Sequence, residues 1–240
     1  MTLHSTLHPA LAALGLVAAM TGACRPRPDA ASPPPPMSVA PVTLPSPSPL
    51  PDPLPDVIAA VNGRPVPLRH ARIIVDQSFQ GRTPTPDQKA VAYRRAMEQL
   101  IARELLYQEA MQRKIQPDAG AVERLRQQVR SEHKDEKAWK AFLAAQGMDP
   151  RSFVDELRVR NVVETMIRQE TETVPAVIPD AEARAYYSAN PNIFESGGRP
   201  LPFEDVRDRI TFQLVTFRRQ EALNALLTRL RSAARVEIFI

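Results

Sequence analysis

The chain has 240 residues, a formal net charge of +4 and one cysteine. This length accommodates one sizeable domain with an extended segment, and the small basic excess argues against nucleic-acid binding because Arg and Glu alternate along charged stretches such as residues 122–140. Four scattered histidines and a lone cysteine lack the spacing of a zinc site, so the sequence predicts neither a metal nor a cofactor.

The chain begins with a segment typical of an export signal. Residues 11–20 form an apolar run that is too short for a permanent transmembrane helix, which needs about 20 residues. Small residues then precede Cys24, an arrangement that resembles a bacterial lipobox, although Thr21 stands where Leu or Val is usual and no Lys or Arg precedes the run. We expect a signal peptide over residues 1–23 and a lipid anchor on Cys24. The alternative is an ordinary secretory signal that leaves Cys24 as a free thiol.

A proline-rich stretch follows the cysteine. Residues 25–56 hold 13 of the 25 prolines of the chain. Because proline lacks the backbone N–H and fixes φ, this stretch disfavours helix and sheet and favours extended polyproline II. At about 3.1 Å per residue it could hold a folded domain up to roughly 100 Å from a membrane. We expect residues 24–56 to form a disordered linker that carries the lipidated cysteine.

The remaining residues predict a mainly helical domain over residues 57–240. An apolar run at residues 57–61 ends in Asn62-Gly63 and predicts a strand with a turn. Apolar residues at helical spacing, separated by caps and stop signals, then predict a series of helices. They cover residues 68–79, 86–113, 119–133, 136–146, a stretch from Pro150 past Ile167, residues 180–190 and residues 203–234.

The last apolar run, residues 236–240, predicts a short C-terminal strand. A lone strand leaves its backbone donors and acceptors unpaired. We therefore predict that residues 57–61 and 236–240 pair with each other, which would bring the two ends of the domain together.

Several stretches of the domain resemble one known family. They are VIAAVNGRPVPLRHA, MEQLIARELLYQEA, FLAAQGMDPRSFVDELR, DAEARAYYSANPNIF and the final PFEDVRDRIT to VEIF, which together span nearly all of residues 57–240. In order and spacing they are similar to the chaperone domain of SurA/PrsA-type periplasmic foldases. The resemblance implies a SurA N-terminal-like helical fold in which paired terminal strands flank the helices and a long C-terminal helix returns to the N-terminal region.

One departure from the family bears on catalysis. Many relatives insert a parvulin-type prolyl isomerase domain of about 90 residues before the C-terminal helix. Here only a few residues, about 195 to 202, lie at that point, and Gly197-Gly198 predicts a simple turn. No Ser-His-Asp, Cys-His or phosphate-loop pattern is present elsewhere. We therefore expect no catalytic residues and no enzymatic activity.

The resemblance implies an ATP-independent chaperone that binds unfolded polypeptide, possible clients being outer-membrane proteins, in an apolar groove. The candidate client-binding residues are Trp139, Phe142, Met148, Met97 and Met111, because aromatic rings and flexible methionines suit varied partners. Packing in the core is the alternative role for each of them. A lipid-anchored periplasmic protein is expected, and Arg25 after the cysteine favours the outer membrane. The alternative functions are a membrane-tethered assembly factor for one partner and a divergent member of the prolyl isomerase family.

Overall fold

The computed structural model describes residues 48–196 and 198–240. The predicted signal peptide, Cys24 and residues 24–47 of the predicted linker lie outside the described residues. Within the described part of the chain, no helix is both long enough and apolar enough to cross a membrane.

The domain is mainly helical, as the sequence predicts, and its helices begin and end close to the predicted positions. They are α1 (Leu68–Phe79), α2 (Pro86–Gln112), α3 (Ala119–Ser131), α4 (Glu136–Ala145), α5 (Pro150–Glu172), α6 (Asp180–Ala189), the 3-10 helix η1 (Pro191–Phe194) and α7 (Phe203–Ala233). The strands are β1 (Val57–Val61), β2 (Arg64–Pro67), β3 (Glu195–Ser196), β4 (Arg199–Pro200) and β5 (Val236–Ile238).

The two ends of the domain meet in a small antiparallel sheet with the order β2-β1-β5. Ala60 pairs with Glu237, which confirms the predicted pairing of the first and last strands. Asn62, at φ 52°, and Gly63, at φ 80°, form the turn between β1 and β2. The Asn62 amide oxygen also accepts a hydrogen bond of 2.9 Å from the backbone N–H of Arg235. One asparagine thus makes the turn and holds the returning chain.

Strand β2 was not predicted from the sequence. Its four residues, Arg64 to Pro67, include two prolines, which cannot donate to a sheet. The structure accommodates them because β2 lies at the edge of the sheet, with its other side unpaired among the described strands.

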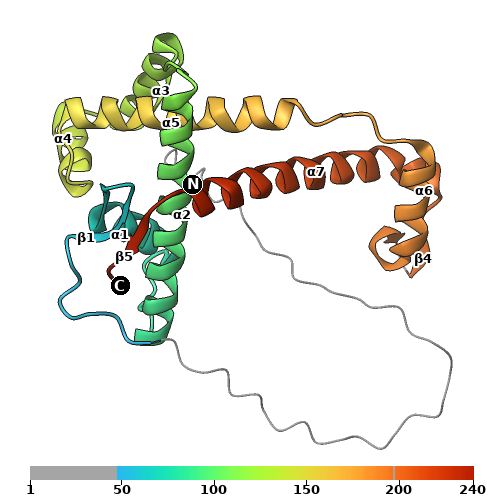
Figure 1. Ribbon diagram of the computed structural model, residues 1–240, viewed down its shortest axis with the longest axis horizontal. Coiled ribbons are helices and arrows are strands. Elements are labelled where there is room, and N and C mark those ends of the chain that lie inside the picture. Colours follow the sequence, from blue (N-terminus) through green and yellow to red (C-terminus); the bar gives the residue numbers. More distant parts are fainter. Residues whose placement is uncertain (1–47, 197) are drawn as a thin grey trace, which may run out of the picture.

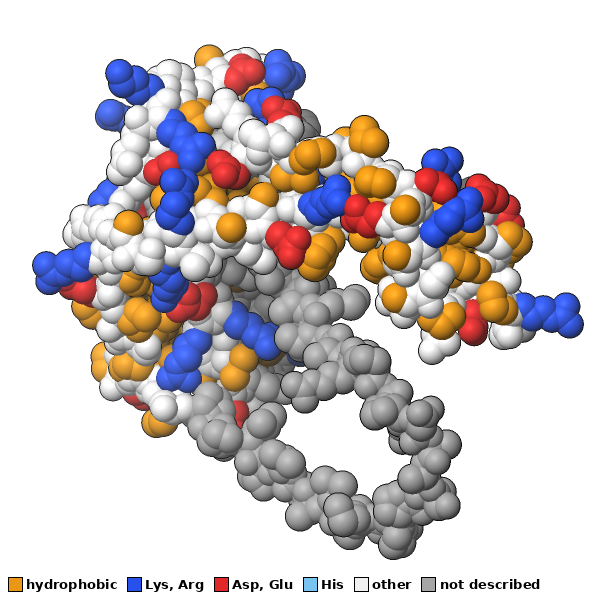
Figure 2. All heavy atoms as spheres, turned by 45° about the vertical axis from the view of Figure 1, so that its right-hand side comes forward, with side chains coloured by type: hydrophobic (Ala, Val, Ile, Leu, Met, Phe, Trp, Pro, Cys, Tyr) orange, Lys and Arg blue, Asp and Glu red, His pale blue; other side chains and the backbone are white. Residues whose placement is uncertain are grey.

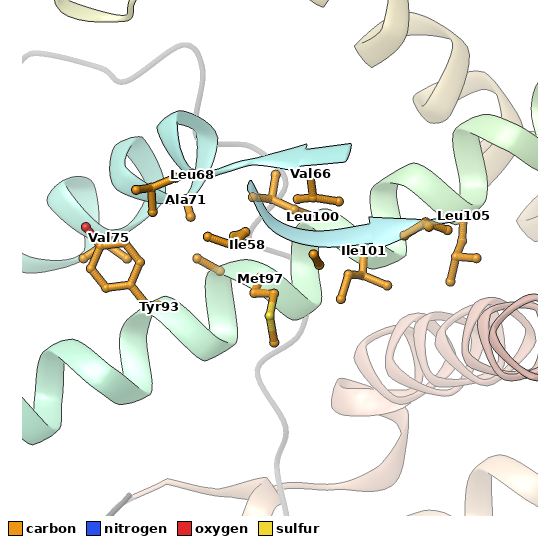
Figure 3. Close-up of a cluster of buried hydrophobic side chains, with 13 residues drawn as sticks. Ile58, Val66, Leu68, Ala71, Val75, Tyr93, Met97, Leu100, Ile101 and Leu105 are labelled. Carbon is orange, nitrogen blue, oxygen red and sulfur yellow. The ribbon is translucent and has the colours of Figure 1, made fainter. Parts of the chain in front are cut away.

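The first core cluster lies between this sheet, α1 and α2. Figure 3 shows side chains of α1 and the strands pointing toward those of α2. Its labelled members are Ile58, Val66, Leu68, Ala71, Val75, Tyr93, Met97, Leu100, Ile101 and Leu105. Leu50 and Leu54, from the end of the predicted linker, also pack against this cluster. The folded unit therefore begins a few residues before Val57.

Helix α2 is the central helix of the molecule. In Figure 1 it runs vertically, with α5 and α7 crossing it and the sheet beside its lower half. A second cluster, which includes Leu106, Val163, Met166 and Leu226, fills the crossing of α2, α5 and α7. An ion pair between Glu98 and Arg231, 2.6 Å from oxygen to nitrogen, also joins α2 to α7.

Helices α3 and α4 and the start of α5 enclose a third cluster that is rich in aromatic rings. Phe153 is 1% exposed, and its ring lies edge-on to that of Trp139 with 5.2 Å between centroids. Trp139 in turn stacks on Phe142 at 5.6 Å. Asp149 accepts a hydrogen bond of 2.7 Å from the backbone N–H of Ser152 and so caps the start of α5.

A fourth cluster forms an outlying lobe at the far end of α7 (Figure 1). It consists of α6, η1, the β3–β4 hairpin and the first half of α7. Phe194 is fully buried, Tyr186 and Tyr187 pack against it, and the Tyr187 hydroxyl donates to the Leu201 carbonyl at 2.6 Å. In the hairpin, Glu195 pairs with Pro200 and Ser196 with Arg199, and Gly197 lies outside the described residues.

Candidate functional site

A hollow of the described surface lies between α1, α2 and the joint of α4 with α5. We call it the first hollow, and its volume is about 380 Å³. Ile73, Ile74, Leu100, Met148 and Leu157 form its apolar lining. Its polar lining consists of His70, Gln77, Ser78, Gln99, Arg103, Gln146, Glu156 and Arg160.

The spacing of residues in α1 explains why one wall of this hollow is apolar. Leu68, Ala71 and Val75 face the sheet and are buried. Ile73 and Ile74 lie on an adjacent face of the same helix, where the core does not cover them fully. The opposite wall comes from the α4–α5 joint, where Gly147 adopts a φ of 62° and ends α4. A side-chain atom at Gly147 would lie about 4.0 Å from Arg69 of α1, so this joint comes close to α1.

A smaller second hollow, about 210 Å³ in volume, adjoins the first. Four residues line both, namely His70, Leu100, Arg103 and Glu156. The second hollow is more polar and adds side chains from β2, α1, α2 and α5, which are Arg64, Pro65, Val66, Pro67, Arg69, Glu104, Tyr107 and Val159. The two hollows are thus separated by a partly polar ridge.

The ridge carries buried charge. Arg103 of α2 forms an ion pair with Glu156 of α5, and their side chains are only 15% and 23% exposed. Burial lowers the pKa of the His70 imidazole beside them; the charge of Glu156 opposes this shift, and Arg69 and Arg103 add to it. His70 is therefore held predominantly neutral near pH 7.

Apolar surface continues on the other side of α1. A third hollow of about 570 Å³ lies between α1 and the start of α2 and includes Phe79, Val91 and Ala92. It shares Ile74, Ser78 and Gln99 with the first hollow. Each of the other two hollows shares lining residues with the first, and we refer to the three together as the α1 groove.

The structure brings three of the five sequence-predicted binding residues together, because Phe142 and Met148 pack against the aromatic cluster that contains Trp139, but it does not bring all five together. Met148 lines the first hollow. Met97 is 3% exposed in the first core cluster, and Trp139 is 7% exposed in the aromatic cluster. Phe142 is half-buried beside Trp139, and Met111 is 37% exposed near the end of α2. Of the five, Met148 alone lies in the α1 groove.

Apart from Met148, the residues that line the groove were not selected from the sequence. Ile73, Ile74 and Leu157 have the helical spacing of ordinary core positions, and a single sequence offers no other signal for them. The described residues contain no group of His, Cys, Asp and Glu side chains placed to hold a metal ion.

With this geometry established, comparison with known proteins becomes informative. Residues 52–169 match the family described as the SurA-like N-terminal domain. This stretch carries a SurA-like N-terminal domain. The match starts just before β1 and ends inside α5, so it covers every helix that lines the α1 groove.

The other comparisons add little. No curated protein sequence matches the chain. A solved structure from Campylobacter jejuni, from work on PEB4 and Cj1289 as two structurally related SurA-like chaperones, is similar at 11% identity with a TM-score of 0.47. It covers 77% of this chain and 99% of its own.

The SurA-like domain supports a chaperone-type role in the periplasm for this chain. It also confirms the family resemblance drawn from the sequence.

Proposed function

We propose that this chain is an ATP-independent periplasmic chaperone that binds unfolded polypeptide segments, including those of outer-membrane proteins, in the α1 groove. The observation that carries the proposal is the first hollow within the SurA-like domain, which the half-buried side chains of Ile73, Ile74 and Met148 line together with the buried Leu100 and Leu157.

The composition of the groove suits varied clients. Burial of one Leu-sized or Phe-sized client side chain contributes about 1.5–3 kcal/mol before ordering costs. The side-chain amides of Gln77, Gln99 and Gln146 make no hydrogen bond within the described part of the chain. An amide both donates and accepts, so these groups suit the backbone of an extended segment whatever its sequence.

The proposal includes a tether. Cys24 would carry the lipid, and the proline-rich linker would hold the SurA-like domain away from the membrane, with the outer membrane as the favoured site. Incorporation of radiolabelled palmitate into the protein, lost in Cys24→Ser, is the expected result. Equal labelling of the variant would contradict the anchor and leave the groove proposal intact.

The groove is tested by a charge placed in its apolar lining. Ile73→Glu should abolish the delay that near-stoichiometric protein causes in the aggregation of an unfolded outer-membrane barrel protein, followed by light scattering. Val177→Glu is the matched control, because Val177 is 80% exposed and lies outside the groove. If both variants delay aggregation as well as the parent protein does, the α1 groove is not the client site.

A second candidate function is a scaffold for one specific partner. It is favoured by Phe212 and Phe217 of α7, which are 72% and 60% exposed. Figure 2 shows hydrophobic side chains reaching the surface of the outlying lobe among charged ones. A double Phe212→Ser, Phe217→Ser variant that keeps aggregation suppression but loses one co-purifying partner would support the scaffold.

We propose that the chain has no enzymatic activity. The support is that β3 and β4 directly connect Phe194 to Leu201 and α7, with the Leu201 N–H donating to the Phe194 carbonyl at 2.7 Å. A peptide assay of Xaa-Pro isomerisation should show only the uncatalysed rate. Acceleration by the purified chain would overturn this part of the proposal.

A further inference from the structure

The charges around the second hollow do not balance. Arg64, Arg69 and Arg103 line it together with Glu104 and Glu156. Arg64 pairs with Glu104 at 3.2 Å, and Arg103 pairs with Glu156. Arg69 is exposed and makes no hydrogen bond or ion pair within the described residues. With His70 neutral, the second hollow therefore carries one uncompensated positive charge.

Arg103 adds one unused donor at the ridge. Its Nη2 atom is held in the ion pair with the Glu156 carboxylate, and its Nε atom is buried and has no hydrogen-bond partner in the described structure. A buried donor without a partner costs free energy, so an acceptor that reached Nε would be stabilised there.

From this juxtaposition we propose that the second hollow is a carboxylate subsite of the client groove. A bound segment would place an apolar side chain in the first hollow and a carboxylate beside Arg69 and the ridge guanidinium of Arg103. The inference rests on the proposed client-binding function and adds a preference to it: segments in which an apolar residue adjoins an acidic group bind best.

A carboxylate fits this position better than a neutral or basic group does. Guanidinium groups bind carboxylates through charge-assisted hydrogen bonds, and the uncompensated charge repels Lys and Arg side chains. The two hollows share their ridge residues, so one short segment can occupy both. The carboxylate can come from an Asp or Glu side chain or from the C-terminus of the client, and both present the same chemistry.

The test uses fluorescently labelled peptides with one apolar core and three endings. One contains Asp and an amidated C-terminus, one contains Asn and a free C-terminus, and one contains Asn and an amidated C-terminus. Binding to the whole protein is measured by fluorescence anisotropy. At low salt at least one carboxylate peptide should bind about three- to tenfold more tightly than the neutral peptide, and the difference should shrink at high salt. Which of the two is preferred identifies the source of the carboxylate.

Two variants separate an electrostatic role from a structural one. Arg69→Gln should remove most of the preference of the protein for the carboxylate peptides over the neutral peptide. Glu156→Gln removes the carboxylate that competes for Arg103, so it should increase affinity for the carboxylate peptides, whereas mere loss of packing would decrease it. Arg219→Gln is the matched control, because Arg219 is exposed on α7 and makes no ion pair within the described residues.

The outcomes distinguish this inference from the function on which it rests. Equal affinity for all three peptides, or no gain in Glu156→Gln, overturns the carboxylate subsite while the apolar groove stands. If no peptide binds and aggregation is not delayed, the proposed function itself fails.

Discussion

Phe153→Ala provides the strongest test of how the structure is packed. Phe153 is 1% exposed and lies in the aromatic cluster of α3, α4 and α5, with its ring edge-on to Trp139 at 5.2 Å and to Phe142 at 6.3 Å. Truncation removes a buried ring and leaves a cavity, which costs about 3–5 kcal/mol in comparable cores. This cost includes the loss of the two edge-on ring contacts, because each of them contributes only about 0.5–1.5 kcal/mol.

The protein contains its own probe for this change. Trp139 is the single tryptophan, and its indole lies within the same cluster. Urea unfolding followed by tryptophan fluorescence should show a midpoint lowered by about 1–2.5 M, because the urea dependence for a chain of this size lies near the upper end of the typical range, at about 2–3 kcal/mol per molar. Circular dichroism at the helical band should report whether the other clusters unfold at the same urea concentration.

The comparison variant is Phe142→Ala. Phe142 is only half-buried on the outside of the cluster, so its truncation should cost clearly less than that of Phe153. If Phe153→Ala costs under about 1 kcal/mol, or no more than Phe142→Ala, then α3, α4 and α5 do not enclose a packed core and this reasoning is refuted.

Three further predictions concern local interactions. Thr85→Ala removes the capping box in which Thr85 and Gln88 exchange hydrogen bonds at the start of α2, and chemical denaturation should show a loss of about 1 kcal/mol. His70, which faces Arg69 of α1, Arg103 of α2, and Glu156 and Arg160 of α5, has a pKa lowered mainly by burial. The unfolded chain therefore binds a proton more readily than the folded one, and stability should fall as the pH drops below about 6.5 and level off below the lowered pKa. His70→Gln should flatten this part of a plot of urea midpoint against pH, and an unchanged slope would contradict the assignment. The pKa of Asp149 is lowered mainly by the backbone N–H of Ser152, so its contribution is present at neutral pH and is lost as the pH falls through the lowered pKa. Asp149→Ala should thus lower the melting temperature at pH 7, and its difference from the parent protein should shrink as the pH falls through the lowered pKa.

Local sequence signals account for much of the agreement between expectation and structure. The cap at Thr85, the cap at Asp149 and the stop at Gly147 depend on residues within a few positions of each other, so their effect can be read without the fold. The pairing of β1 with β5 was also predicted, because two short strands at the ends of a helical chain need partners. Strand β2, in contrast, was not predicted, because it contains two prolines. A sheet tolerates prolines in an edge strand, and only the assembled sheet defines which strand lies at the edge.

The candidate site could not be predicted in the same way. Apolar residues at helical spacing are the signal for a core position, and that signal is the same for Met97, which is buried, and for Ile73, which lines the groove. Whether such a side chain is covered depends on the elements packed opposite to it. Trp139 shows the converse case, because a polar stretch of sequence surrounds a side chain that the fold buries.

The sequence by itself determined the helical class of this protein, the ends of most of its helices and its resemblance to SurA-like domains. Those properties follow from periodicity, caps and the order of motifs, all of which act over short distances along the chain. Only the tertiary structure decided where apolar surface stays open and where charge stays unbalanced. The groove joins α1, the middle of α2 and the α4–α5 joint, and its charges come from the same distant segments. Burial and electrostatic balance depend on which segments meet in space, and that is a property of the packed fold.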